Sequence, residues 1–257
     1  MDLNIEGLRV LVTAASQGLG LACARSLTTD GARVIVSSRN EERLKEAQES
    51  AGLFGYAVAD LSSADDIAAL VAEATERLGG LDAVVVNCGP PPAVTFSDSD
   101  EGHWADAHEQ VTMSAIRLAK AALPEIRKSG RGRLVFIVGY GSREPRSQLV
   151  VSEATRSAVM VVAKVLSREL AMDGVTVNSI AAGLFLTDRV PDIVGRMAEA
   201  AGIGFDEQLA QMVAEVPVGR LGDPDELGDL CAYLCSRQAG FITGQTIVID
   251  GGSNRAV

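Results

Sequence analysis

Ser152 and Arg156 stand four residues apart in a segment with the apolar period of a helix. Residues at i and i+4 share one helix face, so this hydroxyl and this guanidinium are expected to point the same way. A guanidinium stays charged and stabilises anions, but it hardly acts as an acid, and a serine hydroxyl is a far weaker acid than a phenol. The pair therefore favours ligand binding and charge stabilisation over proton transfer.

One phenol lies near this pair in the sequence. Tyr140 is the second residue of the segment "GYGSREPR", which also contains Ser142, Arg143 and Arg146. A neighbouring positive charge lowers the pKa of a phenol, so Tyr140 could donate a proton with Arg143 or Arg156 beside it. The alternative, which we favour, is that Tyr140 only packs its ring and caps a loop.

The chain alternates short β-branched runs with longer segments of helical period, which predicts a parallel, doubly wound sheet of Rossmann type. We expect seven strands, at residues 8–12, 33–37, 55–59, 82–87, 133–138, 175–180 and 245–250. We expect helices at residues 18–29, 40–50, 64–78, 103–128, 151–172 and 224–235. Continuous apolar strands imply helices on both faces of the sheet.

The length of 257 residues suits a single α/β domain, residues 1–257. One long stretch, 181–222, contains Gly183, Gly195, Gly202 and Gly204 and interrupts the alternation, so it is expected to be irregular. Within it, residues 184–213 are predicted to form a lid-like insertion. Its apolar residues hint at a partly apolar small-molecule ligand, although they could equally close the lid's own small core.

The composition argues against several classes of partner. The formal net charge of -11 would repel nucleic acid and anionic membranes. We recognise no secretory signal and no run of transmembrane length. The four cysteines lack metal-ligand spacing, so we expect no metal site and thiols in a reducing cytoplasm.

The first predicted strand leads into a glycine-containing turn that is suited to nucleotide binding. Gly18 and Gly20 stand where a helix begins, and such turns let backbone N–H groups approach a pyrophosphate. Asp60 and Asn87 follow the third and fourth strands, and ligands of open α/β sheets bind at these carboxyl ends.

Several ordered motifs together resemble the short-chain dehydrogenase/reductase family over nearly the whole chain, and its 3-oxoacyl-carrier-protein reductases in particular. They are "TAASQGLG", "ADL", "VVVNCG", "GRLVFIV", "VTVNSIAAG" and "GFITGQTIVIDGG". The resemblance implies a Rossmann fold that binds NAD(P), and a homotetramer or homodimer assembled through residues 112–128, 151–172 and 245–250.

The resemblance also implies a set of cofactor contacts. At the pyrophosphate and adenosine side these are Thr13, Ser16, Gly18, Leu19 and Gly20. Asp60 would contact adenine, Asn87 and Gly89 its ribose, and Thr187 the nicotinamide amide, while Arg156 could hold ribose hydroxyls or an anionic substrate. Arg39 follows the second strand, where NAD-preferring members carry a carboxylate. Because Arg39 could pair with a 2′-phosphate, we favour NADP, with NAD and a merely loop-capping Arg39 as the alternatives.

The chain departs from the family pattern at five positions. The first glycine of the turn is Ala14, whose Cβ either crowds the adenosine or fits if its φ is negative. The catalytic Asn, Ser, Tyr and Lys of the family fall on Thr112, Gly139, Ser152 and Arg156. The standard proton donor is therefore not encoded.

Two functions remain open from the sequence. One is an NADP-linked oxidoreductase acting on carbonyl or hydroxyl groups, with Tyr140, Ser152, Arg156 or an ordered water in the proton path. The other is a nucleotide-binding sensor, regulatory protein or scaffold without redox turnover. The fold cannot distinguish them, because function depends on the site.

Overall fold

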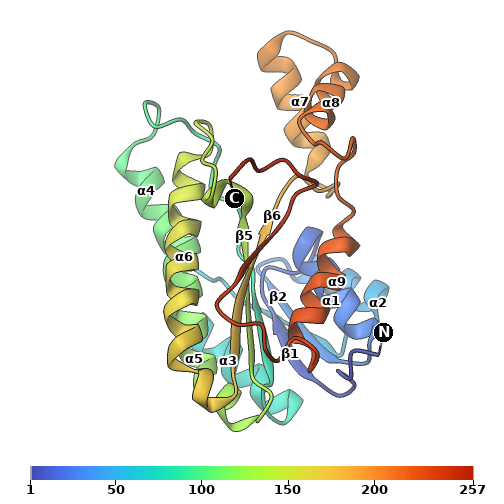
Figure 1. Cartoon of the computed structure of the whole chain (residues 1–257), viewed down its shortest axis with the longest axis vertical. Coiled ribbons are helices and arrows are strands. Elements are labelled where there is room, and N and C mark those ends of the chain that lie inside the picture. Colours follow the sequence, from blue (N-terminus) through green and yellow to red (C-terminus); the bar gives the residue numbers. More distant parts are fainter. Residues whose placement is uncertain (1, 257) are drawn as a thin grey trace.

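The computed structural model describes residues 2–256 and has the predicted doubly wound architecture (Figure 1). Its seven parallel strands have the order β3-β2-β1-β4-β5-β6-β7. The strands are β1 (Arg9–Val12), β2 (Arg33–Ser38), β3 (Gly55–Val58), β4 (Ala83–Val86), β5 (Arg133–Gly139), β6 (Thr176–Ala182) and β7 (Thr246–Ile249). All seven coincide with predicted strands, so the predicted fold class is confirmed.

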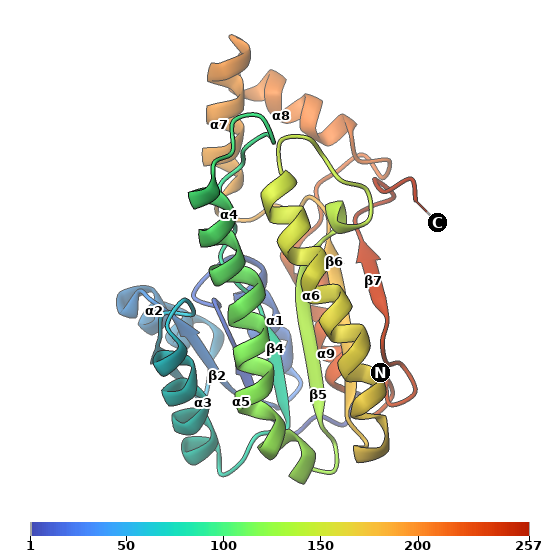
Figure 2. The ribbon, with the colours of Figure 1, turned by 90° about the vertical axis from the view of Figure 1, so that its left-hand side faces the viewer.

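Helices cover both faces of the sheet, as Figures 1 and 2 show. One face carries α1 (Gly18–Thr29), α2 (Glu41–Ala51) and α9 (Pro224–Cys235). The other carries α3 (Ala64–Leu78), α5 (Ser114–Lys128) and α6 (Val150–Glu169). None of the described helices is long and apolar enough to cross a membrane.

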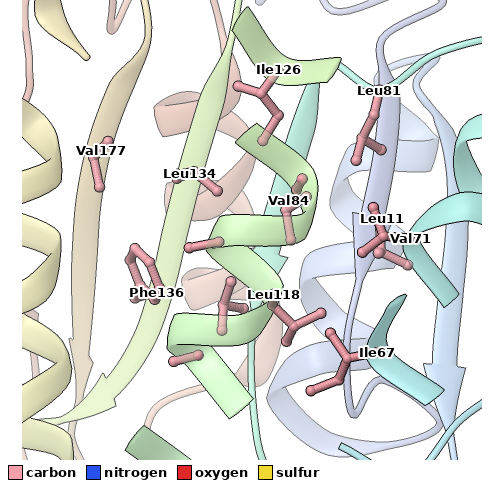
Figure 3. Packing of buried hydrophobic residues seen from close by; sticks show 14 of the residues in the cluster. Leu11, Ile67, Val71, Leu81, Val84, Leu118, Ile126, Leu134, Phe136 and Val177 are labelled. Atoms are coloured by element: carbon pink, nitrogen blue, oxygen red, sulfur yellow. The ribbon is translucent and has the colours of Figure 1, made fainter. Parts of the chain in front are cut away.

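Each face of the sheet buries its own apolar cluster. Phe136 and Leu134 of β5 point toward the α3, α5 and α6 side, where they join Leu118 and Ile67 (Figure 3). Alternate residues of the same strand, such as Val135, belong to the cluster on the opposite side. Burial of both strand faces explains why these strands read as continuous apolar runs.

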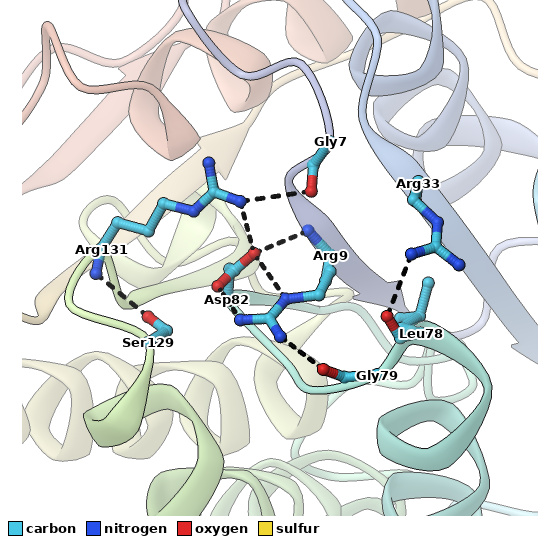
Figure 4. A network of polar contacts seen from close by, with 8 residues as sticks. All are labelled: Gly7, Arg9, Arg33, Leu78, Gly79, Asp82, Ser129 and Arg131. Carbon is cyan, nitrogen blue, oxygen red and sulfur yellow. Dashed lines mark hydrogen bonds and ion pairs between the residues drawn. The ribbon is translucent and has the colours of Figure 1, made fainter.

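The amino end of the sheet is held together by a buried carboxylate. Asp82, which precedes β4 and is fully buried, accepts three hydrogen bonds from Arg9 and one from Arg131 (Figure 4). Burial alone would raise the pKa of this carboxyl group, but the hydrogen bonds from Arg9 and Arg131 outweigh it and hold the pKa below its ordinary value. The network ties the starts of β1 and β4 to the loop before β5.

The stretch 181–222 is not irregular, and our prediction was wrong here. It contains two helices, α7 (Val190–Ala201) and α8 (Phe205–Ala214), which project from the end of the body in Figure 1. Gly202 and Gly204 cap these helices at their ends instead of preventing them. Val190, Val194 and Met212 form a small core between the two helices, so part of the apolar content of the predicted lid closes the lid itself.

Candidate active site

A cavity of about 550 Å³ lies at the carboxyl ends of the strands, the usual ligand position in doubly wound folds. The predicted site residues that line it are Ser16, Gly18, Leu19, Arg39, Asp60, Asn87, Gly89, Ser152, Arg156 and Thr187. Thr13, Gly20 and Tyr140 are buried and are not among its lining residues. The structure therefore brings the predicted nucleotide end and catalytic end into one continuous cavity.

The glycine turn has the geometry of a nucleotide-binding turn. A Cβ at Gly20 would lie 2.7 Å from the Ala14 carbonyl oxygen and 2.8 Å from Asn87 Nδ2, so this position requires glycine. Helix α1 begins at Gly18, whose φ is +59°, and its first backbone N–H groups are free of partners within the helix. A pyrophosphate placed there would meet those donors and the positive end of the helix dipole.

Ala14 adopts a left-handed backbone conformation with φ of +47°. The alternative in which this residue keeps a negative φ is therefore wrong. The left-handed conformation costs an L-residue roughly 1–2 kcal/mol. Ala14 thus has the positive φ that is typical of glycine at this position, and its Cβ makes that conformation strained. Ala14 is one of the residues that line the cavity.

Thr13 and Asn87 hold the ends of β1 and β4 together. The Thr13 hydroxyl donates to the Asn87 carbonyl oxygen at 2.7 Å and accepts from the Asn87 N–H at 3.1 Å. Asn87 Nδ2 in turn donates to the Ala14 carbonyl oxygen at 3.0 Å. The buried Thr13 therefore holds the glycine turn in place through Asn87, and Asn87 also lines the cavity.

The adenosine end of the cavity has two arginines. Arg39 follows β2 as predicted, and Arg43, which the sequence reading missed, lies one turn into α2. The Arg43 guanidinium donates to the side-chain oxygen of Gln17 at 2.8 Å, across the mouth of the turn. Asp60 lies nearby; hydrogen bonds from the backbone N–H and hydroxyl of Ser62, and the charge of Arg39, hold its pKa below the ordinary value.

Four residues occupy the catalytic positions of the family pattern. Thr112 is buried in a six-residue π-helical segment, His108–Met113, and donates to the Thr155 carbonyl oxygen. Such segments are frequent at functional sites. Gly139, at the end of β5, leaves open space on its outer side, where an added Cβ would touch only Arg156 Cδ at 3.7 Å.

Ser152 and Arg156 share one face of α6, as predicted. Arg156 Nε lies 3.4 Å from the Ser152 hydroxyl oxygen, and its Nη1 donates to the Ile137 carbonyl oxygen at 3.1 Å. The guanidinium is thereby folded over the end of β5, in the space that Gly139 leaves. No described carboxylate forms an ion pair with it.

The structure does not bring Tyr140 into the cavity. Its ring packs in the core beside α6, and its hydroxyl oxygen accepts a hydrogen bond from Arg146 at 2.9 Å. Burial raises the pKa of Tyr140, and Glu215, Glu153 and Asp250 add to this, whereas only Arg146 opposes it. A proton donor near neutral pH needs the opposite shift, so the role predicted for Tyr140 has no geometric support.

Arg146 and Glu153 form a pair beside this phenol. Glu153 is buried and accepts from the Arg146 backbone N–H at 2.6 Å and from its Nε at 3.1 Å. The Arg146 guanidinium also stacks on the Tyr140 ring, 4.5 Å from its centroid. These contacts fix the loop after β5. The charge of Arg146 is neutralised by Glu153 within the protein.

The segment after β6 supplies Thr187 and a further residue that the sequence reading missed. Thr187 lies against the glycine turn, with its Cγ2 3.9 Å from the position of a Cβ at Gly18. Arg189 lines the same cavity. Because Arg189 stands only two residues after Thr187, the sequence could have indicated that it also lies at the cavity. Burial lowers the pKa of Arg189, and the charges of Arg196 and Arg156 lower it further, whereas the charge of Asp192 opposes them. Arg189 and Arg156 thus line one cavity.

Comparisons with known proteins show which family the chain is similar to. A family model described as Enoyl-(Acyl carrier protein) reductase matches residues 13–254. The chain is 33% identical over 251 residues to the 3-oxoacyl-acyl-carrier-protein reductase FabG of Vibrio cholerae, an alignment that covers 97% of this chain and 98% of the relative.

Two solved structures are similar over almost the whole chain. L-sorbose reductase from Gluconobacter frateurii, complexed with NADPH and L-sorbose, is 27% identical with a TM-score of 0.94, covering 100% of both chains. An NADPH-bound short-chain oxidoreductase from Pseudomonas aeruginosa, described as containing an atypical catalytic center, is 27% identical with a TM-score of 0.88. That alignment covers 98% of this chain and 99% of the other.

Proposed function

We propose that this chain, which belongs to the short-chain dehydrogenase/reductase family, is an NADP(H)-dependent oxidoreductase whose Arg156 takes over the stabilising part of the usual catalytic group. The observation that carries the proposal is the position of Arg156. It is a permanent cation at the cavity, on the helix face where the family carries its Tyr and Lys, and no described carboxylate pairs with it.

The residues of the cavity define how such a reaction would be assisted. NADP(H), when bound, supplies or accepts the hydride. Arg156 would stabilise the negative charge that develops on a carbonyl oxygen, and the Ser152 hydroxyl would help to position that oxygen. The described lining contains no phenol, imidazole or ammonium group. The proton that completes the alcohol is therefore assigned to water beside Ser152.

The choice of NADP over NAD rests on the adenosine end. Arg39 and Arg43 line the cavity there, and neither forms an ion pair with a described carboxylate. A 2′-phosphate would find two guanidinium groups at this end, whereas no Asp or Glu follows β2 directly to bind both ribose hydroxyls. The NADPH-bound relatives support the same choice.

A nucleotide-binding protein without redox turnover is the second candidate. The glycine turn, which keeps Gly18 and Gly20, favours it when taken together with the replacement of all four catalytic positions. Arg156 would then hold a ligand without promoting its reaction. The same experiment distinguishes the two functions.

The test is NADPH oxidation by the purified protein with a panel of aldehydes, ketones and quinones. We expect turnover in the wild type and a loss of about 10²- to 10³-fold in Arg156→Gln, because one preorganised donor to the developing oxyanion is removed. The matched control is Arg168→Gln, an exposed arginine on the same helix. We expect this control, and Tyr140→Phe, to keep the wild-type rate.

Two outcomes would contradict the proposal. Tight NADPH binding without turnover on any substrate would favour the silent candidate. Turnover abolished by Tyr140→Phe alone would return the phenol to the mechanism despite its burial.

We also propose that the protein assembles as a homotetramer or homodimer in the cytoplasm and acts on a small molecule. Val161 and Val165, one turn apart on α6, are 66% and 49% exposed, and β7 is an edge strand of the sheet. Apolar side chains at this spacing suit packing against a second copy. Light scattering after size-exclusion chromatography should give a multiple of the chain mass, and Val161→Asp should reduce it. A monomeric wild type would contradict the assembly.

A further inference from the structure

The charges around the cavity are opposite in sign to those of the whole chain. The protein carries a formal net charge of -11, yet its cavity is lined by five arginines and three acids. Arg39 and Arg43 stand at the adenosine end. The other three, Arg146, Arg156 and Arg189, stand at the end expected to receive the substrate.

Only one of those three arginines is neutralised by the protein. Arg146 is paired with the buried Glu153. Arg156 and Arg189 form no ion pair with any acid among residues 2–256. Both line the same cavity, and like charges at one cavity repel each other. Of the three acids that line the cavity, Glu153 pairs with Arg146, whereas Asp60 and Asp188 form no ion pair with Arg156 or Arg189. Two cations that line one cavity without an ion-pair partner are unfavourable alone and favourable around an anion.

We infer that Arg189 is a specificity-determining residue that binds a carboxylate of the substrate, so that the substrate class is a 2-oxo acid or the corresponding 2-hydroxy acid. This inference rests on the proposed function. In a 2-oxo acid the reacting carbonyl and the carboxylate are adjacent. Arg156 can therefore hold the carbonyl oxygen while Arg189 holds the carboxylate through its planar, two-pronged guanidinium.

The position of Arg189 in the fold suits this role. It lies between Thr187, which faces the glycine turn, and the start of α7, the first helix of the predicted lid. A carboxylate bound there would link the lid to the body through Arg189 and α6 through Arg156. The apolar lid residues Met197 and Phe205 are exposed and do not line the cavity. The charged residues of the described lining therefore indicate the substrate class more specifically than these apolar residues do.

The test uses oxamate, an unreactive mimic of a short 2-oxo acid, and oxamide, its neutral counterpart. Both are titrated into the protein with and without NADPH, and binding is followed by NADPH fluorescence and thermal shift. We expect oxamate to bind at least about tenfold more tightly than oxamide, as a hydrogen-bonded charge pair predicts. Arg189→Gln should remove this preference and leave the Kd of NADPH unchanged.

Arg168→Gln is the control, because Arg168 is an exposed arginine on α6 that lies outside the cavity lining. It should bind oxamate like the wild type. Equal binding of oxamate and oxamide by the wild type would overturn the inference. A loss of NADPH affinity in Arg189→Gln as large as the loss of oxamate affinity would overturn it too, by assigning Arg189 to the cofactor phosphates. Oxamate is not reduced, so its binding can be measured even if the protein shows no turnover. A failure of the proposed oxidoreductase function is therefore distinguishable from a failure of this inference.

Discussion

The two ends of the parallel sheet use arginine in different ways. At the amino end, Arg9 and Arg131 surround the buried carboxylate of Asp82 and satisfy it with four hydrogen bonds (Figure 4). At the carboxyl end, Arg156 and Arg189 face a cavity with no described acid paired to them. Charges that the protein neutralises hold strands together, whereas charges that it leaves unpaired are available to a ligand.

Breaking the paired end should give the largest effect on stability. Asp82→Asn removes a fully buried carboxylate and leaves two arginines without a counter-ion. We expect it to lower the free energy of unfolding by about 3–5 kcal/mol, measured by urea denaturation. The control Asp225→Asn, which breaks an exposed pair with Arg25, should cost about 1 kcal/mol or less. A similar small cost for Asp82→Asn would contradict the comparison.

The same network predicts how stability depends on pH. Because the folded pKa of Asp82 lies below its unfolded value of about 3.9, its contribution is complete above that value. The contribution is lost as the pH falls through the lower, folded pKa. Asp82→Asn should therefore remove part of the acid sensitivity of the wild type between these two values.

Removing a charge from the unpaired end should leave stability almost unchanged. Arg156→Leu gives up a long hydrogen bond to Ser152 and one to the Ile137 carbonyl, but it also relieves repulsion with Arg189. We expect the free energy of unfolding to change by no more than about 1 kcal/mol. Arg9→Leu at the other end is the comparison variant, and its loss should be clearly larger. Equal losses would show that Arg156 is also structural.

The smallest effect concerns the backbone of the carboxyl end. Ala14→Gly should stabilise the protein by about 1 kcal/mol, because glycine tolerates a φ of +47° at little cost. Thermal melting with and without NADPH measures both this gain and any tighter cofactor binding. The neighbouring Ala15→Gly should destabilise, since Ala15 is fully buried and its φ is not positive. A less stable Ala14→Gly would mean that the methyl group is itself well packed.

The sequence predicted the sheet well because its signals there are local and redundant. Each strand is a short β-branched run, and glycines or caps such as Asn40 and Ser63 mark the helix boundaries. The stretch 181–222 was misread because its glycines were taken as breaks. The repeat of Val190, Val194 and Ala198 at helical spacing was the stronger signal.

The candidate site was predicted only in part. The order of motifs placed Arg39, Asn87, Ser152 and Arg156 around one cavity, because strand ends are easy to locate. Side-chain direction was harder. Leu134, Phe136, Val138 and Tyr140 all belong to the cluster on the α6 side, so the alternation along β5 already predicts an inward Tyr140. Arg189 follows no strand directly, and only the fold of the lid brings it to the cavity.

The contact between the first helix and the last one has a consequence for synthesis. Helix α1 packs against α9, and Gly228 lies so close that a Cβ there would be 2.6 Å from the Ala22 carbonyl oxygen. Nearly two hundred residues separate these helices along the chain. A ribosome that has made only the first half has thus produced a glycine turn whose helix lacks one side of its packing. The packing of α1, the helix that follows the glycine turn, becomes complete only when the residues up to Cys235 have left the ribosome.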